Sequence, residues 1–122
     1  MIVPPVIVDD HGDVDFFASV EDAEVYLEPW AVEEGFTVYD SEGRLLELRV
    51  ERRESHVLFG LIRSKVDHVR IEAVEDDPHH ARQLRATLLT FLERVGISFD
   101  NSQVLPIREL VRRGVEHVGL TR

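Results

Sequence analysis

The sequence predicts an α+β fold, in which an antiparallel sheet of four to six strands packs one face against two C-terminal helices, with one short helix near the N-terminus. Apolar and polar residues alternate in several segments of the first 75 residues, as half-buried strands require. Helical spacing of apolar residues replaces this alternation after residue 77. The length of 122 residues suits a single globular domain, which we assign to residues 1–122.

The N-terminal segment predicts a first hairpin. Residues 2–8 are apolar and mostly β-branched, and Pro4-Pro5 restricts part of this strand to a sheet edge or to a lead-in. The turn-forming residues 9–13 follow, and alternation then continues over 13–18 as a second short strand.

The central segment predicts a second hairpin and a further strand. Residues 36–40 and 44–52 read as two strands joined by a turn that contains Gly43. Residues 56–62 are mostly apolar and fit either a buried strand or a loop, and alternation over 66–75 indicates another strand.

A short helix is expected over residues 20–28. Ser19 is a favourable N-cap, and Pro29 marks the end of the helix. At 100° per residue, Glu21, Glu24 and Glu28 fall on one arc beside the apolar face, so we expect them to form one exposed acidic ridge.

The C-terminal third predicts two longer helices. The first spans 78–95, because Asp77-Pro78 is a typical helix start and Gly96 a typical C-cap. The second spans 105–117 and is weakened by Gly114.

The negative charge is concentrated in the first third of the chain. The formal net charge is −10, and residues 1–43 contain 12 acidic residues with no lysine or arginine, which leaves 12 acids against 14 bases in residues 44–122. An acidic chain is repelled by phosphate, which argues against nucleic acid and anionic membranes as partners. The asymmetry favours a basic protein partner, although a solvated acidic face explains it equally well.

Composition also restricts the chemistry. The chain has no cysteine, and its six histidines show no recognised metal-ligand spacing. The acidic turn at 9–13 lacks the pattern of a calcium loop, and no nucleophile or phosphate-binding motif is present. We therefore expect no catalytic residues, no metal and no cofactor. The N-terminus does not resemble a signal peptide and no apolar run is long enough to span a membrane, so we expect a cytoplasmic protein.

Six of the nine aromatic residues also lie in the acidic third, and most of them are expected in the core. Aromatic side chains surrounded by carboxylates are typical of tight interfaces with basic partners. The candidate partner-binding residues are Asp9, Asp10, Asp13, Glu21, Glu24, Glu28, Trp30, Glu33, Glu34 and Tyr39.

Residues 19–30 and 37–48 resemble small bacterial immunity proteins of polymorphic toxin systems, including contact-dependent growth inhibition. The stretches are SVEDAEVYLEPW and TVYDSEGRLLEL, and the C-terminal helices match more loosely. The resemblance implies an acidic, non-catalytic, cytoplasmic protein that binds and neutralises a cognate toxin domain.

Two alternatives remain open from the sequence. One is a small enzyme with an unrecognised pocket. The other is a homo-oligomeric interaction domain that pairs through an exposed edge strand at residues 2–8. The sequence allows a monomer or a dimer.

Overall fold

The computed structural model describes residues 2–57, 62–73, 78–97 and 105–121. The polar loop at 98–103 and the expected N-cap Asp77 lie outside the described residues, as does Gly60 within the undecided segment 56–62.

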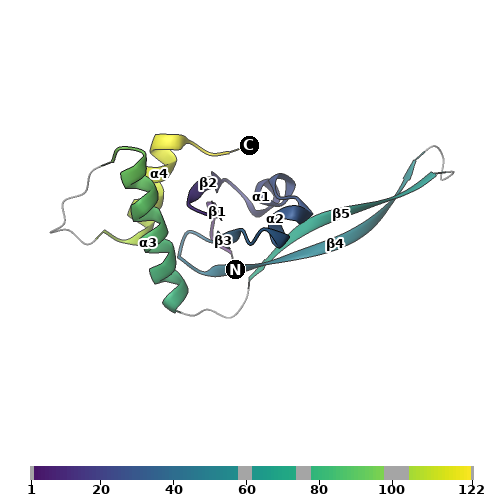
Figure 1. The fold of residues 1–122 in the computed structure, drawn as a ribbon, viewed down its shortest axis with the longest axis horizontal. Helices are drawn as coiled ribbons and strands as arrows, with labels where there is room; N and C mark the ends of the chain where they lie inside the picture. The colour runs from purple at the N-terminus through teal and green to yellow at the C-terminus, as the bar shows by residue number, and fades with distance from the viewer. Residues whose placement is uncertain (1, 58–61, 74–77, 98–104, 122) are drawn as a thin grey trace.

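Five strands form one antiparallel sheet in the order β2-β1-β3-β4-β5 (Figure 1). Their bounds are Val6–Asp10 for β1, Asp13–Phe17 for β2, Thr37–Tyr39 for β3, Leu45–Val57 for β4 and Ile62–Ala73 for β5. The α+β class and the antiparallel sheet are confirmed.

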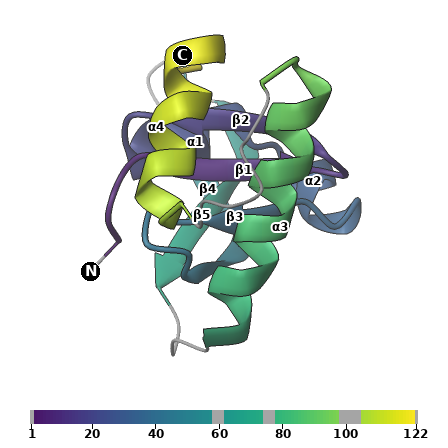
Figure 2. The ribbon, with the colours of Figure 1, turned by 90° about the vertical axis from the view of Figure 1, so that its left-hand side faces the viewer.

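Helices cover both faces of this sheet. The C-terminal helices α3, Pro78–Arg94, and α4, Ile107–Val118, lie over one face, as Figure 2 shows. Two short helices, α1 at Val20–Tyr26 and α2 at Pro29–Glu33, lie on the other. The expected packing of one sheet face against the two C-terminal helices is confirmed. The N-terminal region forms two short helices in place of the one expected.

The short strands β1 and β2 supply apolar side chains to both layers. Ile7 and Phe16 pack with Leu84, Leu88 and Leu110 of the C-terminal helices. Their neighbours in the chain point to the opposite face, where the core contains Val6, Val8, Phe17, Ala23, Leu27, Ala31, Val38, Leu46, Val69 and Ile71. This dual burial explains why residues 6–8 form a continuous apolar run.

The first strand lies inside the sheet. β1 begins at Val6 and pairs with β2 on one side and β3 on the other, so residues 2–8 are not an exposed edge strand. Residues 2–5 precede the strand, and Val3 N–H donates to the buried carboxylate of Asp40 at 3.2 Å. Self-association through this strand is thus incompatible with the sheet order, because both of its edges are already hydrogen-bonded.

The expected helix at 20–28 is shorter than predicted, and a second short helix follows it. Ser19 is the N-cap of α1, since its Oγ accepts from Asp22 N–H at 3.1 Å. The helix ends at Tyr26, and Leu27 and Glu28 are extended. Pro29 then begins α2, because a proline disfavours helical backbone in the preceding residue yet suits the first turn of a new helix.

Strands β4 and β5 form a long ribbon that projects beyond the rest of the molecule (Figure 1). Backbone pairing extends from Leu46 with Ala73 to Val57 with Ile62. Segment 56–62, for which the sequence allowed a strand or a loop, therefore contributes the end of β4 and the first residue of β5. β4 continues past the expected end at residue 52, and β5 begins before the expected start at residue 66. Residues 74 and 75 of the expected strand lie outside the described residues.

Candidate functional site

The strongest candidate site lies on α2 and the adjoining turns. We call it the acidic aromatic patch. Its members are Asp10, His11, Tyr26, Glu28, Trp30, Glu33, Glu34 and Phe36.

Large aromatic side chains are exposed in this patch. Trp30 is 53% exposed and Tyr26 is 45% exposed, and Val25 next to Tyr26 is 85% exposed. The Trp30 ring meets the partly buried Phe36 ring edge to face, with centroids 5.4 Å apart. Grouped exposed aromatic side chains are frequent at surfaces that contact another molecule.

A hollow of about 180 Å³ lies between these rings. The residues that line it are Tyr26, Leu27, Glu28, Trp30, Ala31 and Phe36. The Trp30 indole N–H donates to Glu28 Oε2 at 2.7 Å, which fixes a carboxylate at the margin of the hollow.

The patch carries unneutralised negative charge. Glu28, Glu33 and Glu34 are exposed, and none of them takes part in a salt bridge with any residue that the structure describes. His11 lies beside them, with Nδ1 3.0 Å from Asp10 Oδ1. The hydrogen bond to Asp10 and the nearby charges of Asp9 and Glu34 raise the pKa of His11 above 6.5.

Asp9, another candidate partner-binding residue, lies in the same turn, but its carboxylate is hydrogen-bonded to the backbone of the turn. Its Oδ1 accepts from Gly12 N–H at 2.8 Å, which closes the turn between β1 and β2. This bond holds His11 at the edge of the patch.

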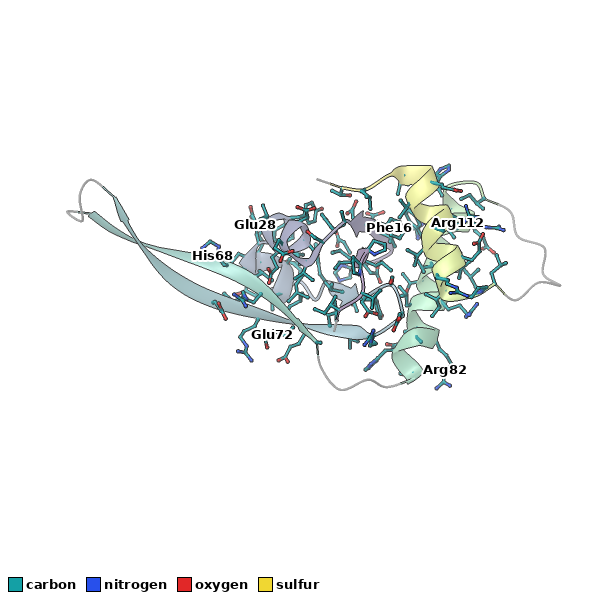
Figure 3. The ribbon with its side chains drawn as sticks, turned by 180° about the vertical axis from the view of Figure 1, so that it is seen from behind. Phe16, Glu28, His68, Glu72, Arg82 and Arg112 are labelled. Carbon is teal, nitrogen blue, oxygen red and sulfur yellow. The ribbon has the colours of Figure 1, made fainter. Side chains whose placement is uncertain are left out.

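The expected ridge of Glu21, Glu24 and Glu28 does not exist. Glu28 lies beyond the end of α1, and Glu24 turns toward β5, where its Oε2 accepts from Ile71 N–H at 2.8 Å. Arg70 Nε lies 3.7 Å from the same oxygen and offsets its charge. Glu21 and Glu24 line a second hollow, with His68 and Arg70 of β5, on the side where Figure 3 labels His68.

Two further candidate residues lie away from the patch. Tyr39 is 3% exposed and packs in the core against the C-terminal helices, so it is not available to a partner at the surface. Burial raises the pKa of its hydroxyl. Asp13 is exposed, but its Oδ1 lies 3.9 Å from Arg94 Nη1 of α3, on the opposite helical layer.

The sequence interpretation missed three members of the patch, Tyr26, Phe36 and His11. Tyr26 and Phe36 were counted among aromatic residues expected mostly in the core, yet one is 45% exposed and the other lines the hollow. Pro29 was the sequence signal that could have located them, because it disfavours helical backbone at Glu28 and begins α2, so that Tyr26 and Trp30 lie on different helices.

A larger hollow of about 590 Å³ lies between α4 and the N-terminal segment. Its lining is mainly apolar, including Pro4, Pro5, Val111 and Leu120, and Arg112 at its margin pairs with Glu109 and Glu116. Figure 3 shows Arg112 on the helical layer opposite Glu28.

Over the described ranges, no group of three or more histidine, aspartate or glutamate residues is placed to hold a metal ion. None of the helices in the described part of the chain combines the length and apolarity needed to cross a bilayer.

Fold and site together define an α+β protein whose sheet lies between two helical layers, with an acidic aromatic patch on one layer. The chain matches no protein-family model, and comparisons with curated proteins and with solved structures gave no significant match.

Proposed function

We propose that this chain is a cytoplasmic immunity protein that binds a cognate bacterial toxin domain and neutralises it without catalysis. One observation carries the proposal: exposed Trp30 and Tyr26 are grouped with Glu28, Glu33 and Glu34, whose carboxylates form no salt bridge with any residue that the structure describes.

Such a surface suits a basic protein. Aromatic side chains supply contact area at a low cost in conformational entropy, and they are enriched among the residues that dominate binding energies. Carboxylates around them attract cationic partners over a distance of about one Debye length and exclude acidic ones. The toxin face in contact with the patch is therefore rich in arginine and lysine.

The resemblance to immunity proteins supports the same class. Its first stretch, residues 19–30, spans α1 and the start of α2, which carry much of the patch. A protein that only covers or distorts a toxin's active site needs an adhesive surface and no catalytic groups of its own.

We expect the neighbouring open reading frame to encode the toxin, and the test uses the toxin domain found there. We expect co-expression of this chain to restore growth of cells that express the domain, and we expect the purified proteins to bind. The association rate should fall as salt shortens the Debye length from about 10 Å at 0.1 M to about 3 Å at 1 M.

Charge-reversal variants in the patch and on the opposite helical layer can be compared. The double variant Glu33→Lys and Glu34→Lys should slow association at low salt, whereas Glu93→Lys, an exposed position on α3, should bind as the parent protein does. Unchanged toxin affinity and growth protection in the folded double variant would show that the patch is not part of the interface. Its acidic residues would then form a solvent-exposed surface with no role in toxin binding.

A further inference from the structure

The hollow in the acidic aromatic patch has the size of one side chain. Ligand pockets usually measure about 300–1,000 Å³, and this hollow has about 180 Å³. Tyr26, Trp30 and Phe36 come from three different segments and place aromatic rings around it, with Leu27 and Ala31 completing the apolar lining. A whole cofactor does not fit, but the end of a long side chain does.

The rings and the carboxylate present complementary features to a cation. The face of an aromatic ring attracts a cation within about 6 Å of its centroid, and tryptophan does so most strongly. Glu28 adds a full negative charge, and because Oε2 already accepts from the Trp30 indole, Oε1 remains available as an acceptor among the described residues.

We propose that this hollow receives the guanidinium group of an arginine side chain from the toxin, stacked on Trp30 and hydrogen-bonded to Glu28. The assignment of this arginine to a toxin rests on the proposed function. The chemistry of the hollow can be tested without the toxin.

Arginine suits the hollow better than lysine for two physical reasons. The guanidinium group is planar and weakly hydrated, so it stacks on aromatic faces and leaves water at a lower cost than an ammonium group. Its N–H donors also form a fixed fork that can engage a carboxylate oxygen while the plane rests on a ring.

Trp30 provides a direct signal, because it is the only tryptophan in the chain. We expect N-acetyl-arginine amide to change its fluorescence in a saturable way, with a dissociation constant on the order of millimolar for a single side chain. The neutral isostere N-acetyl-citrulline amide should give no saturable change, and N-acetyl-lysine amide should bind several-fold more weakly than the arginine probe.

Two variants separate the contributions of charge and ring. Glu28→Gln should weaken binding of the arginine probe by up to about fivefold, the upper end of the range for an exposed charge pair. Trp30→Ala, followed by NMR chemical shifts, should abolish the binding, and Glu93→Gln on α3 should leave it unchanged. Thermal melting of each variant checks the fold.

Equal binding of citrulline and arginine would overturn the inference, as would equal binding of lysine and arginine. Undiminished arginine binding by folded Trp30→Ala or Glu28→Gln would also overturn it. The two proposals fail differently: arginine binding at the hollow without toxin binding contradicts only the proposed function. Toxin binding that survives Trp30→Ala unchanged contradicts only the arginine assignment.

Discussion

At the scale of single residues, Gly114 shows how close packing overrides helix propensity. Glycine weakens a helix by about 1 kcal/mol relative to alanine, and it was expected to weaken this one. The structure gives its reason, because Gly114 is buried against the ring of Phe16, where α4 crosses β2.

We predict that Gly114→Ala destabilises the protein. The added Cβ would lie 2.8 Å from Phe16 Cε2 and closer still to Cζ, a clash that the buried ring cannot avoid without repacking. Overpacking of this kind costs about 1–3 kcal/mol, which exceeds the gain in helix propensity. Urea denaturation measures the loss. Combining the change with Phe16→Leu should recover part of it, and an equal or higher midpoint for Gly114→Ala would contradict the close approach.

His11 gives a pH-dependent prediction. Its pKa is raised above 6.5 in the folded chain, chiefly by its hydrogen bond to Asp10. A raised pKa means that protonation favours the folded state: the contribution is fully present below the unfolded pKa of about 6.5 and is lost as pH rises through the folded pKa. NMR titration of the His11 ring should give a value above 6.5, and Asp10→Asn should lower it. A pKa at or below 6.5 in the parent protein would remove the His11–Asp10 interaction.

At the scale of elements, the short helix α1 is attached to the edge of the sheet by a side chain. Glu24 accepts the backbone N–H of Ile71 on β5 and lies near Arg70, whereas Glu21, one turn earlier, is exposed. The two glutamates share a helix and a charge, but only one of them completes the hydrogen bonding of an edge strand.

These contacts predict unequal effects of alanine substitution. Glu24→Ala should lower the free energy of unfolding by about 1.5–3 kcal/mol, the range for a hydrogen bond to a charged group, because Ile71 N–H loses its acceptor. Glu21→Ala should change it by less than about 0.5 kcal/mol. Chemical denaturation of both variants is the measurement. Equal stabilities would show that Glu24 is as free in solution as Glu21.

At the scale of the whole molecule, the two helical layers differ in charge. The acidic first third forms strands β1 to β3 and the helices α1 and α2, and the acidic aromatic patch belongs to this side. The C-terminal helices carry exposed arginines on the opposite layer, where Figure 3 labels Arg82 and Arg112. The molecule therefore presents faces of different charge, which favours one orientation when it meets a basic partner.

We predict that folding is independent of metals. The sequence has no recognised ligand set, so a chelator should leave the melting temperature unchanged. Differential scanning calorimetry with and without EDTA is the measurement. A drop of several degrees that zinc or calcium reverses would reveal a metal site.

The sequence by itself determined the class of fold and the position of most elements. Signals within a few residues were sufficient to locate the ends of elements and the turns between them. Ser19 caps α1, a turn at Gly43 joins β3 to β4, and Pro78 begins α3. The concentration of acids in residues 1–43 is also a property of the sequence alone, and these residues form the side of the molecule that carries the patch.

Only the tertiary structure decided which of these residues act together. Periodicity placed three glutamates on one ridge, but the helix end at Tyr26 separates Glu28, and a strand distant in sequence engages Glu24. Tyr39 looked like a surface anchor and is buried, because β3 lies inside the sheet beneath the C-terminal helices. Burial and pairing depend on contacts between segments far apart in the chain, and no local pattern encodes those contacts.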